Sequence, residues 1–264
     1  MYRGSGFLYP GSHNRRTIVE VRMAQEQKVD TTKPSIARSY DAVLGGKDNY
    51  SVDREVRDQL LAVTPELGTL AWDNRGFLVR VTRYLAGQAG ITQFLDCGSG
   101  LPTAENTHQA AQRVNEEARV VYVDNDPIVL AHGRALLEEN DHTHVVQADF
   151  TDPDTLLGEP VSSILDFDQP LALYHIGTLH HLDDEQRPQE LAARYIDALP
   201  SGSYFVLSHF YNAGAADPEL SALADRLEAA FLGSPMGSGR FRRYEEIAEY
   251  FPGLELVEPG LVPI

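Results

Sequence analysis

The sequence has little cysteine, no long apolar run and no obvious export signal. Cys97 is the only cysteine among 264 residues, which excludes an intrachain disulfide and a cysteine-rich metal site. No stretch approaches the roughly 18 apolar residues that a membrane-spanning helix needs. Residues 1–30 do not follow the basic-then-apolar order of a secretory signal. We therefore expect a cytoplasmic protein with no membrane partner.

Positive charge is also scarce, with 22 basic residues against 39 acidic ones and a formal net charge of −17. Affinity for a nucleic-acid backbone comes largely from Lys and Arg. The basic clusters at 15–16 and 240–243 are interpreted as solvated surface charge. The composition therefore argues against a nucleic-acid partner.

Apolar periodicity divides the chain into three parts. Residues 1–33 show no clear period and are interpreted as a tail, with a short strand predicted at 17–21. Residues 34–90 follow a helical period and are predicted to form a cap on a sheet. Residues 91–264 alternate between strand and helix patterns, which predicts a mostly parallel sheet with helices on both faces.

Each predicted element has its own range in the sequence. Helices of the cap are predicted at 35–44, 56–63 and 70–85. Strands of the sheet are predicted at 91–95, 120–123, 144–147, 171–176, 203–209 and 254–258, with residues 261–264 as a possible start of a last strand. Helices between and after them are predicted at 103–114, 127–139, 154–157, 185–199, 218–231 and 244–251.

Residues 92–102 are interpreted as a strand that ends in a glycine turn. Phe94 belongs to the buried end of the strand, and Asp96 follows at its carboxyl end. Gly98 and Gly100 allow a tight turn and a close approach of the backbone to a ligand, since they carry no Cβ. Such a turn at the carboxyl edge of a parallel sheet is where α/β folds bind nucleotide-like ligands.

The next predicted strand ends at Asp124, roughly 25 to 30 residues after the glycine turn, where an acidic residue typically binds ribose hydroxyls. The alternative is that Asp124 only caps the following helix. The third strand ends at Asp149 and Phe150. There the carboxylate is placed to accept a hydrogen bond from a base amine, and the ring to contact the base. The alternative is a capping Asp beside a packed Phe.

Two ligands fit an adenosine site of this type. A dinucleotide-binding motif has a third glycine, where the pyrophosphate binds to a helix N-terminus. In this sequence Thr103 occupies that position, after Pro102. A carboxylate at Asp96 repels pyrophosphate and suits the ammonium group of an amino acid. Adenosine joined to an amino acid describes S-adenosylmethionine.

These motifs resemble a known group of enzymes. Residues 96–100, Asp124 and residues 149–150 look like the ordered motifs of class I S-adenosylmethionine-dependent methyltransferases. Two further parts of the chain are similar to one bacterial family of S-adenosyl methyltransferases whose substrate is unassigned. These similar stretches are 39–50 and, in the sheet part, 100–103 and 122–129. The resemblance covers roughly residues 35–264 and implies a Rossmann-like α/β fold with an N-terminal helical cap.

The resemblance also implies roles for individual residues. Asp96 and the backbone of residues 98–100 would hold the methionine end, Asp124 the ribose, and residues 149–150 the adenine. Residues 174–177 would line the methyl-transfer face, and Tyr40 and Asn49 would close over the cofactor as part of a lid, unless the cap is simply packed on the sheet. The residues expected to bind the cofactor are Tyr40, Asn49, Asp96, Gly98, Ser99, Gly100, Leu101, Asp124, Asn125, Asp149, Phe150 and His175.

The cofactor brings an activated methyl group, so a general base is needed only if the acceptor loses a proton. Candidate bases at the predicted ends of the fourth and fifth strands are His175, His209 and Tyr211, although packing alone also explains each histidine. Residues 180–184 contain two His and two Asp, but adjacent His side chains usually diverge, so we expect no metal site. Residues 72–75 form a cluster that is placed to meet a substrate, with its tryptophan interpreted as core.

We therefore expect a methyltransferase that acts on a small-molecule acceptor. Two alternatives remain open at this point: a protein that binds S-adenosylmethionine without turnover, and a nicotinamide-dependent oxidoreductase. One feature departs from the class I pattern, because such sheets usually finish with a β-hairpin and this chain stops soon after the strand predicted at 254–258. The sequence leaves the oligomeric state and the identity of the acceptor open.

Overall fold

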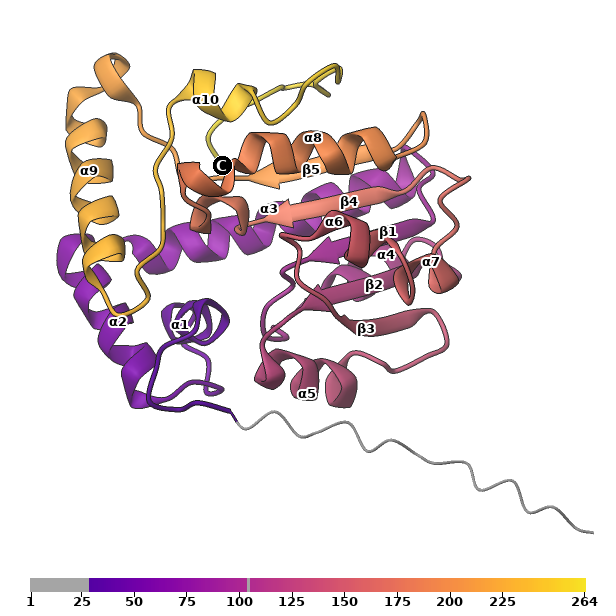
Figure 1. Ribbon diagram of the computed structural model, residues 1–264, viewed down its shortest axis with the longest axis horizontal. Coiled ribbons are helices and arrows are strands. Elements are labelled where there is room, and N and C mark those ends of the chain that lie inside the picture. Colours follow the sequence, from indigo (N-terminus) through magenta and orange to yellow (C-terminus); the bar gives the residue numbers. More distant parts are fainter. Residues whose placement is uncertain (1–28, 104) are drawn as a thin grey trace, which may run out of the picture.

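The computed structural model describes residues 29–103 and 105–264. The strand predicted at 17–21 lies outside them. Five parallel strands form one sheet in the order β3-β2-β1-β4-β5 (Figure 1). They are β1 (Gln93–Cys97), β2 (Arg119–Asp124), β3 (Thr143–Gln147), β4 (Ala172–Ile176) and β5 (Tyr204–Ser208). This confirms the predicted Rossmann-like α/β class, with the strand order reversing between β1 and β4.

Side chains alternate along each strand, so the sheet has an apolar core on both faces. Leu95 and Cys97 of β1 pack with the face covered by α6 (Pro153–Leu157), α7 (Val161–Ile164) and α8 (Pro188–Ala198). Phe94 packs with the opposite face, which is covered by α3 (Leu67–Gly87), α4 (Thr107–Gln112) and α5 (Pro127–Leu136). In Figure 1, α3 passes behind the sheet while α6 and α8 lie in front of it.

The cap forms from both ends of the sequence. Helix α1 (Ile36–Val43) packs on α2 (Ser51–Val63), and α2 contacts α9 (Pro218–Gly233) directly. The apolar side chains that join them are Val56, Leu60, Leu67 and Phe231. Helix α3 begins in this cluster with Leu67, and its Leu85 packs in the sheet core. One continuous helix therefore connects the cap to the sheet.

The helix predicted at 103–114 begins later than expected. α4 starts only at Thr107, after Asn106, whose side chain forms a capping box with Gln109. Asn106 Oδ1 also accepts a hydrogen bond from Thr103 N at 3.0 Å. Pro102 therefore lies in a loop and not in the first turn of the helix, because the stronger N-cap signal follows it.

No strand forms at 254–258 or 261–264 within the described part of the chain, so both predictions are wrong. α10 (Tyr244–Ala248) is followed by turns, in which Leu254 N donates to Phe251 O and Gly260 N to Val257 O. The intervening apolar side chains are more than a third exposed, so burial does not hold them against β5. β5 therefore stays at the edge of the five-stranded sheet.

Short elements complete the chain. They are η1 (Leu179–His181), η2 (Asp184–Gln186) and η3 (Gly214–Ala216), each a single 3₁₀ turn. Over residues 29–103 and 105–264, no helix combines the length and apolar character needed to cross a bilayer.

Candidate active site

The glycine turn after β1 is held in place by its neighbour β2. Gly98 N and Ser99 N both donate to Val123 O, at 2.8 and 3.1 Å. Gly98 and Gly100 have φ values of +70° and +66°, which L side chains rarely adopt. A Cβ on Gly98 would lie 2.5 Å from Thr178 Cγ2, whereas a Cβ on Gly100 would meet nothing within 4 Å. The turn is therefore closed toward β4 and open at Gly100.

Asp96 lies inside β1, one residue before its end at Cys97, whereas the sequence predicts it directly after a strand that ends at residue 95. Its side chain points to the α3–α4 face, where Thr107 Oγ1 donates to Asp96 Oδ2 at 2.6 Å. Burial raises the pKa of Asp96, and the hydrogen bond from Thr107 and the nearby charge of Arg75 partly offset this. A cationic ligand group beside this buried carboxylate would restore its charged form.

Asp124 ends β2 at the rim of the turn. Its Oδ2 accepts from Gly100 N at 3.0 Å, and its Oδ1 accepts from Asp126 N at 2.9 Å. Burial raises the pKa of Asp124 despite these two bonds. The cap of α5 is Asp126, whose side chain accepts from Ile128 N. Asp124 is therefore not the helix cap that the alternative interpretation required, and each of its oxygens keeps a further lone pair.

The third pair of predicted site residues is split by the structure. Phe150 lines the cavity described below, with its ring edge-on to His175 and its carbonyl oxygen accepting from Tyr195 Oη at 2.7 Å. Asp149 is exposed, and its Oδ1 accepts from both the backbone and the hydroxyl of Thr151. The predicted contact of Asp149 with adenine stays a prediction.

One cavity of about 1940 Å³ extends from the glycine turn, across the ends of β4 and β5, to the cap. The side of it formed by the ends of β1 and β2 and the turn is called the cofactor wall. The side formed by the ends of β4 and β5 and by α3 apart from Arg75 is called the acceptor wall, and Arg75 and Phe150 are counted with the cofactor wall. Predicted site residues that line the cavity are Tyr40, Asp96, Gly98, Ser99, Gly100, Asp124, Asn125, Phe150, His209 and Tyr211. Those that do not are Asn49, Leu101, Asp149 and His175.

Three of the excluded residues have clear structural partners. Asn49 donates to Asp41 Oδ2 at 2.7 Å, and Leu101 is buried against α5. His175 is fully buried among aromatic rings, with Nδ1 3.1 Å from Thr178 Oγ1. Burial lowers the pKa of His175 to about 3. It is a neutral imidazole of the core that does not line the cavity.

His209 lines the acceptor wall but has both ring nitrogens engaged. Its Nδ1 donates to Phe210 O at 2.8 Å, which leaves Nε2 to accept from Arg242 Nη1 at 3.2 Å. Arg242 is buried and also donates to Asp184 Oδ1 at 2.7 Å. Burial lowers the pKa of His209 to about 4, and the charge of Arg242 acts in the same direction. The geometry therefore gives His209 no free nitrogen to take a proton, while Tyr211 lies beside Arg242 in an isolated bridge.

A hydrogen-bonded chain crosses the acceptor wall from the cap to β5. Asn74 accepts from Ser208 Oγ at 2.6 Å and donates to Tyr40 Oη at 3.2 Å, and Tyr40 Oη donates to Ala71 O at 2.9 Å. Burial raises the pKa of Tyr40, so its hydroxyl stays protonated. These contacts fix the side chain of Asn74 at the end of the sheet.

The sequence predicts that residues 72–75 form a cluster placed to meet a substrate, with Trp72 as part of the core. Asn74 and Arg75 line the cavity, and Arg75 Nη2 donates to Glu105 O at 2.9 Å. Trp72 is 49% exposed, so its interpretation as core is wrong. A helical wheel of α3 would have separated them, since Asn74 and Arg75 follow the cavity-lining residues Leu70 and Ala71 by about one turn.

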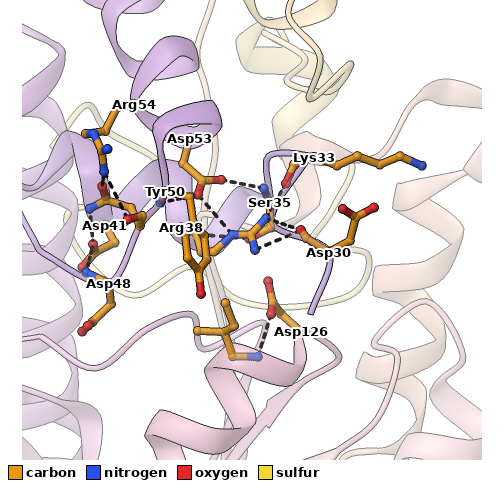
Figure 2. Close-up of polar contacts among 12 residues, drawn as sticks. Asp30, Lys33, Ser35, Arg38, Asp41, Asp48, Tyr50, Asp53, Arg54 and Asp126 are labelled. Carbon is orange, nitrogen blue, oxygen red and sulfur yellow. Dashed lines mark hydrogen bonds and ion pairs between the residues drawn. The ribbon is translucent and has the colours of Figure 1, made fainter. Parts of the chain in front are cut away.

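Residues 29–38, called the N-terminal segment, form a further wall near the end of β2. Figure 2 shows Arg38 between Asp53 and the backbone of residues 30–33, with Asp126 close by. The Arg38–Asp53 ion pair has an Nε–Oδ2 distance of 3.2 Å, and both side chains are almost fully buried. Asp53 also accepts from Ser35 N, which fixes the segment where it meets Asn125 and a smaller cavity of about 430 Å³.

The fold and the site together define a class of protein. The parallel sheet carries a glycine turn at its switch point, with one buried carboxylate near the end of β1 and a second at the end of β2. This is the arrangement of a class I S-adenosylmethionine-dependent methyltransferase. A sequence profile of the S-adenosyl methyltransferase family matches residues 22–264, and the chain belongs to that family. No curated protein matches the chain.

Solved structures agree with this assignment. A candidate methyltransferase from Thermobifida fusca is 46% identical, with 88% of this chain and 85% of that chain covered and a TM-score of 0.80. A DUF574 family protein from Streptomyces avermitilis is 39% identical, with 89% and 88% covered and a TM-score of 0.81. An O-methyltransferase family protein from Burkholderia thailandensis shares only the fold, at 14% identity, 78% and 67% coverage and a TM-score of 0.50. The protein is thus an S-adenosylmethionine-dependent methyltransferase, and nothing supports the nicotinamide or binding-only alternatives.

Proposed function

We propose that the protein methylates a small organic molecule that binds on the acceptor wall, next to S-adenosylmethionine on the cofactor wall. The observation that supports this proposal is the continuity of the cavity. It connects Asp96 and Asp124 with the part of the cavity that lies between the acceptor wall and the cap, called the chamber. Residues from α1, α3 and α9 enclose that chamber and are mostly apolar. This enclosure supports a small acceptor and not a polymer.

The residues of the cofactor wall fit the cofactor by charge and shape. Asp96 is a buried carboxylate suited to the ammonium group of the methionine end, and Arg75 on the facing helix is suited to its carboxylate. The open side of Gly100 leaves room for the backbone to approach the ligand. Asp124 would accept from the ribose hydroxyls, and Phe150 and Asn125 would contact adenine.

When bound, S-adenosylmethionine supplies a methyl group on a sulfonium that needs no further activation. The work left to this chain is to orient the acceptor and to exclude water. Asn74, fixed by Ser208 and Tyr40, lies where the acceptor wall meets β4 and is placed to orient a polar group. We also propose a cytoplasmic location for this methyltransferase.

Calorimetric titration with S-adenosylhomocysteine tests the cofactor wall. Asp124→Ala should weaken binding at least about tenfold, because it removes a charge-assisted acceptor from the ribose position. The matched control is Asp152→Ala, which removes an exposed carboxylate that caps α6 outside the cavity. Equal affinity of wild type and Asp124→Ala would contradict the proposed site, and binding of NAD instead would contradict the proposed cofactor.

A further inference from the structure

His180 is a buried polar side chain that the site described so far does not use. It lies in η1 just after β4, is 4% exposed and lines the cavity. Its ring stacks on Phe210 with a centroid distance of 3.6 Å, and its carbonyl oxygen accepts from Arg240 N. Within residues 29–103 and 105–264, neither ring nitrogen forms a hydrogen bond, and Nδ1 is in addition fully buried. A buried polar atom without a partner weakens the fold, so its presence calls for an explanation.

The ring edge of His180 lies near Gly177 on the acceptor wall. Gly177 ends the β4 turn with φ of +76°. The position that a Cβ would take on Gly177 lies 3.3 Å from Asn74 Nδ2 and 4.0 Å from His180 Cε1. Since Cε1 stands between the two ring nitrogens, an amide donor and an imidazole edge both lie close to the side of Gly177 that has no Cβ. All three residues line the cavity.

The hydrogen-bonding capacity near Gly177 can be counted. Asn74 uses its oxygen for Ser208 Oγ and one N–H for Tyr40, which leaves one N–H free. Burial lowers the pKa of His180, as does the charge of Arg242, so the imidazole is neutral and keeps a lone pair. The other histidines of this wall are engaged, because His181 Nδ1 pairs with Ser238 Oγ and His209 with Arg242.

We propose that Asn74 and His180 form a subsite above Gly177 that holds a hydroxyl group of the methyl acceptor. This proposal rests on the proposed function and names the acceptor class of the same site. A hydroxyl accepts from the free N–H of Asn74 Nδ2 and donates to the imidazole lone pair, so this N–H and this lone pair are satisfied at once. An ammonium group has nothing to accept with, and a carboxylate has no proton for the lone pair. The acceptor is an uncharged hydroxyl compound with an apolar body, since Phe210 and Ile176 adjoin the subsite.

Three probes that differ only in one group test the subsite: 4-hydroxybiphenyl, 4-methoxybiphenyl and biphenyl-4-carboxylate. Each is titrated into the protein saturated with S-adenosylhomocysteine. For the wild type we expect the hydroxyl probe to bind at least about tenfold more tightly than the other two. His180→Phe keeps the stack on Phe210 and removes both nitrogens. It should abolish the hydroxyl preference without lowering the melting temperature, because it replaces an unpaired polar group with an apolar one.

His181→Phe is the matched control. It removes a neighbouring imidazole whose Nδ1 already pairs with Ser238 Oγ, so it should lower the melting temperature and keep the hydroxyl preference. Equal binding of the three probes, preference for the carboxylate, no saturable binding, or loss of preference in both variants would overturn the subsite. Titration of S-adenosylhomocysteine alone distinguishes failure of the proposed function from failure of the subsite. If the wild type fails to bind it, the proposed function falls as well; if binding is normal and no hydroxyl preference is found, only the subsite falls.

Discussion

The two walls of the cavity are held together in different ways. On the cofactor wall, Asp124 is fixed by backbone N–H groups of the turn and of the segment next to it. On the acceptor wall, the fixing contacts join side chains from distant segments, as between Asn74 and Ser208 or between His209 and Arg242. The cofactor wall is therefore built by local backbone geometry, whereas the acceptor wall exists only when the cap, β5 and the C-terminal segment are docked together.

The difference has a consequence for ligand binding. Substitutions in the acceptor wall should change the acceptor preference while leaving cofactor affinity nearly intact. Substitutions in the turn, or in the contacts that hold the N-terminal segment beside it, should affect the cofactor first.

The largest effect on stability is expected at the buried ion pair beside the cofactor wall. Arg38→Ala leaves Asp53 buried without its charged partner and should lower the free energy of unfolding by about 3–5 kcal/mol. Urea denaturation measures this. Arg194→Ala removes an exposed pair with Asp154 and should cost less than about 1 kcal/mol. Equal losses in the two variants would show that the N-terminal segment is not held by the buried pair (Figure 2).

Gly98→Ala should have the next largest effect. The added Cβ combines a left-handed backbone with a contact 2.5 Å from Thr178 Cγ2, which together should cost about 2–4 kcal/mol and abolish S-adenosylhomocysteine binding. Thr178→Ser removes the clashing methyl group and keeps the hydroxyl that pairs with His175. The double variant should recover roughly half of the lost stability. Failure of this rescue would mean that the backbone conformation alone requires glycine.

Lowering the pH should change the folding stability through the two walls in opposite directions. Burial lowers the pKa of both His209 and His181 to about 4, so between pH 6.5 and 4 the unfolded chain binds protons that the folded chain does not. The stability contributed by these neutral histidines is complete above pH 6.5 and is lost as the pH falls through that window. The raised pKa values of Asp96 and Asp124 oppose this loss, because the folded state binds their protons more readily.

The pH effect can be assigned by one substitution. The loss of stability between pH 7.5 and pH 5 should shrink by about 1–2 kcal/mol in His209→Gln, since glutamine does not titrate. Urea denaturation at both pH values measures the difference. An unchanged loss in the variant would show that His209 is not a source of the acid sensitivity.

The sequence predicts the strands beside the cofactor wall because its signals are contiguous. Strand, glycine turn and acidic strand ends follow one another within short segments, and the five-stranded sheet confirms the strands, while the ligand contacts stay predictions. The errors come from competing local signals. Pro102 suggests a helix start, but the capping box at Asn106 determines it. A strand is predicted at 254–258, but turns on both sides prevent one.

The acceptor wall could not be predicted in the same way. Asn74 and Ser208 are separated by 134 residues, so no local pattern links them. The choice between His175 in β4 and His180 after it depends on side-chain direction. His175 points from β4 into the core against Phe205, whereas His180 is turned by η1 into the cavity, five residues later. Periodicity places both near the strand end, but only the turn geometry separates them.

The division of the cavity into two walls is tested most directly by titrating S-adenosylhomocysteine into three proteins side by side. Asp96→Asn removes the buried charge of the cofactor wall and should weaken binding by about tenfold or more. Asn74→Ala breaks the chain across the acceptor wall and should change the affinity by less than about twofold, the level at which distant sites act independently. Equal losses in the two variants, or a larger loss in Asn74→Ala, would contradict the account.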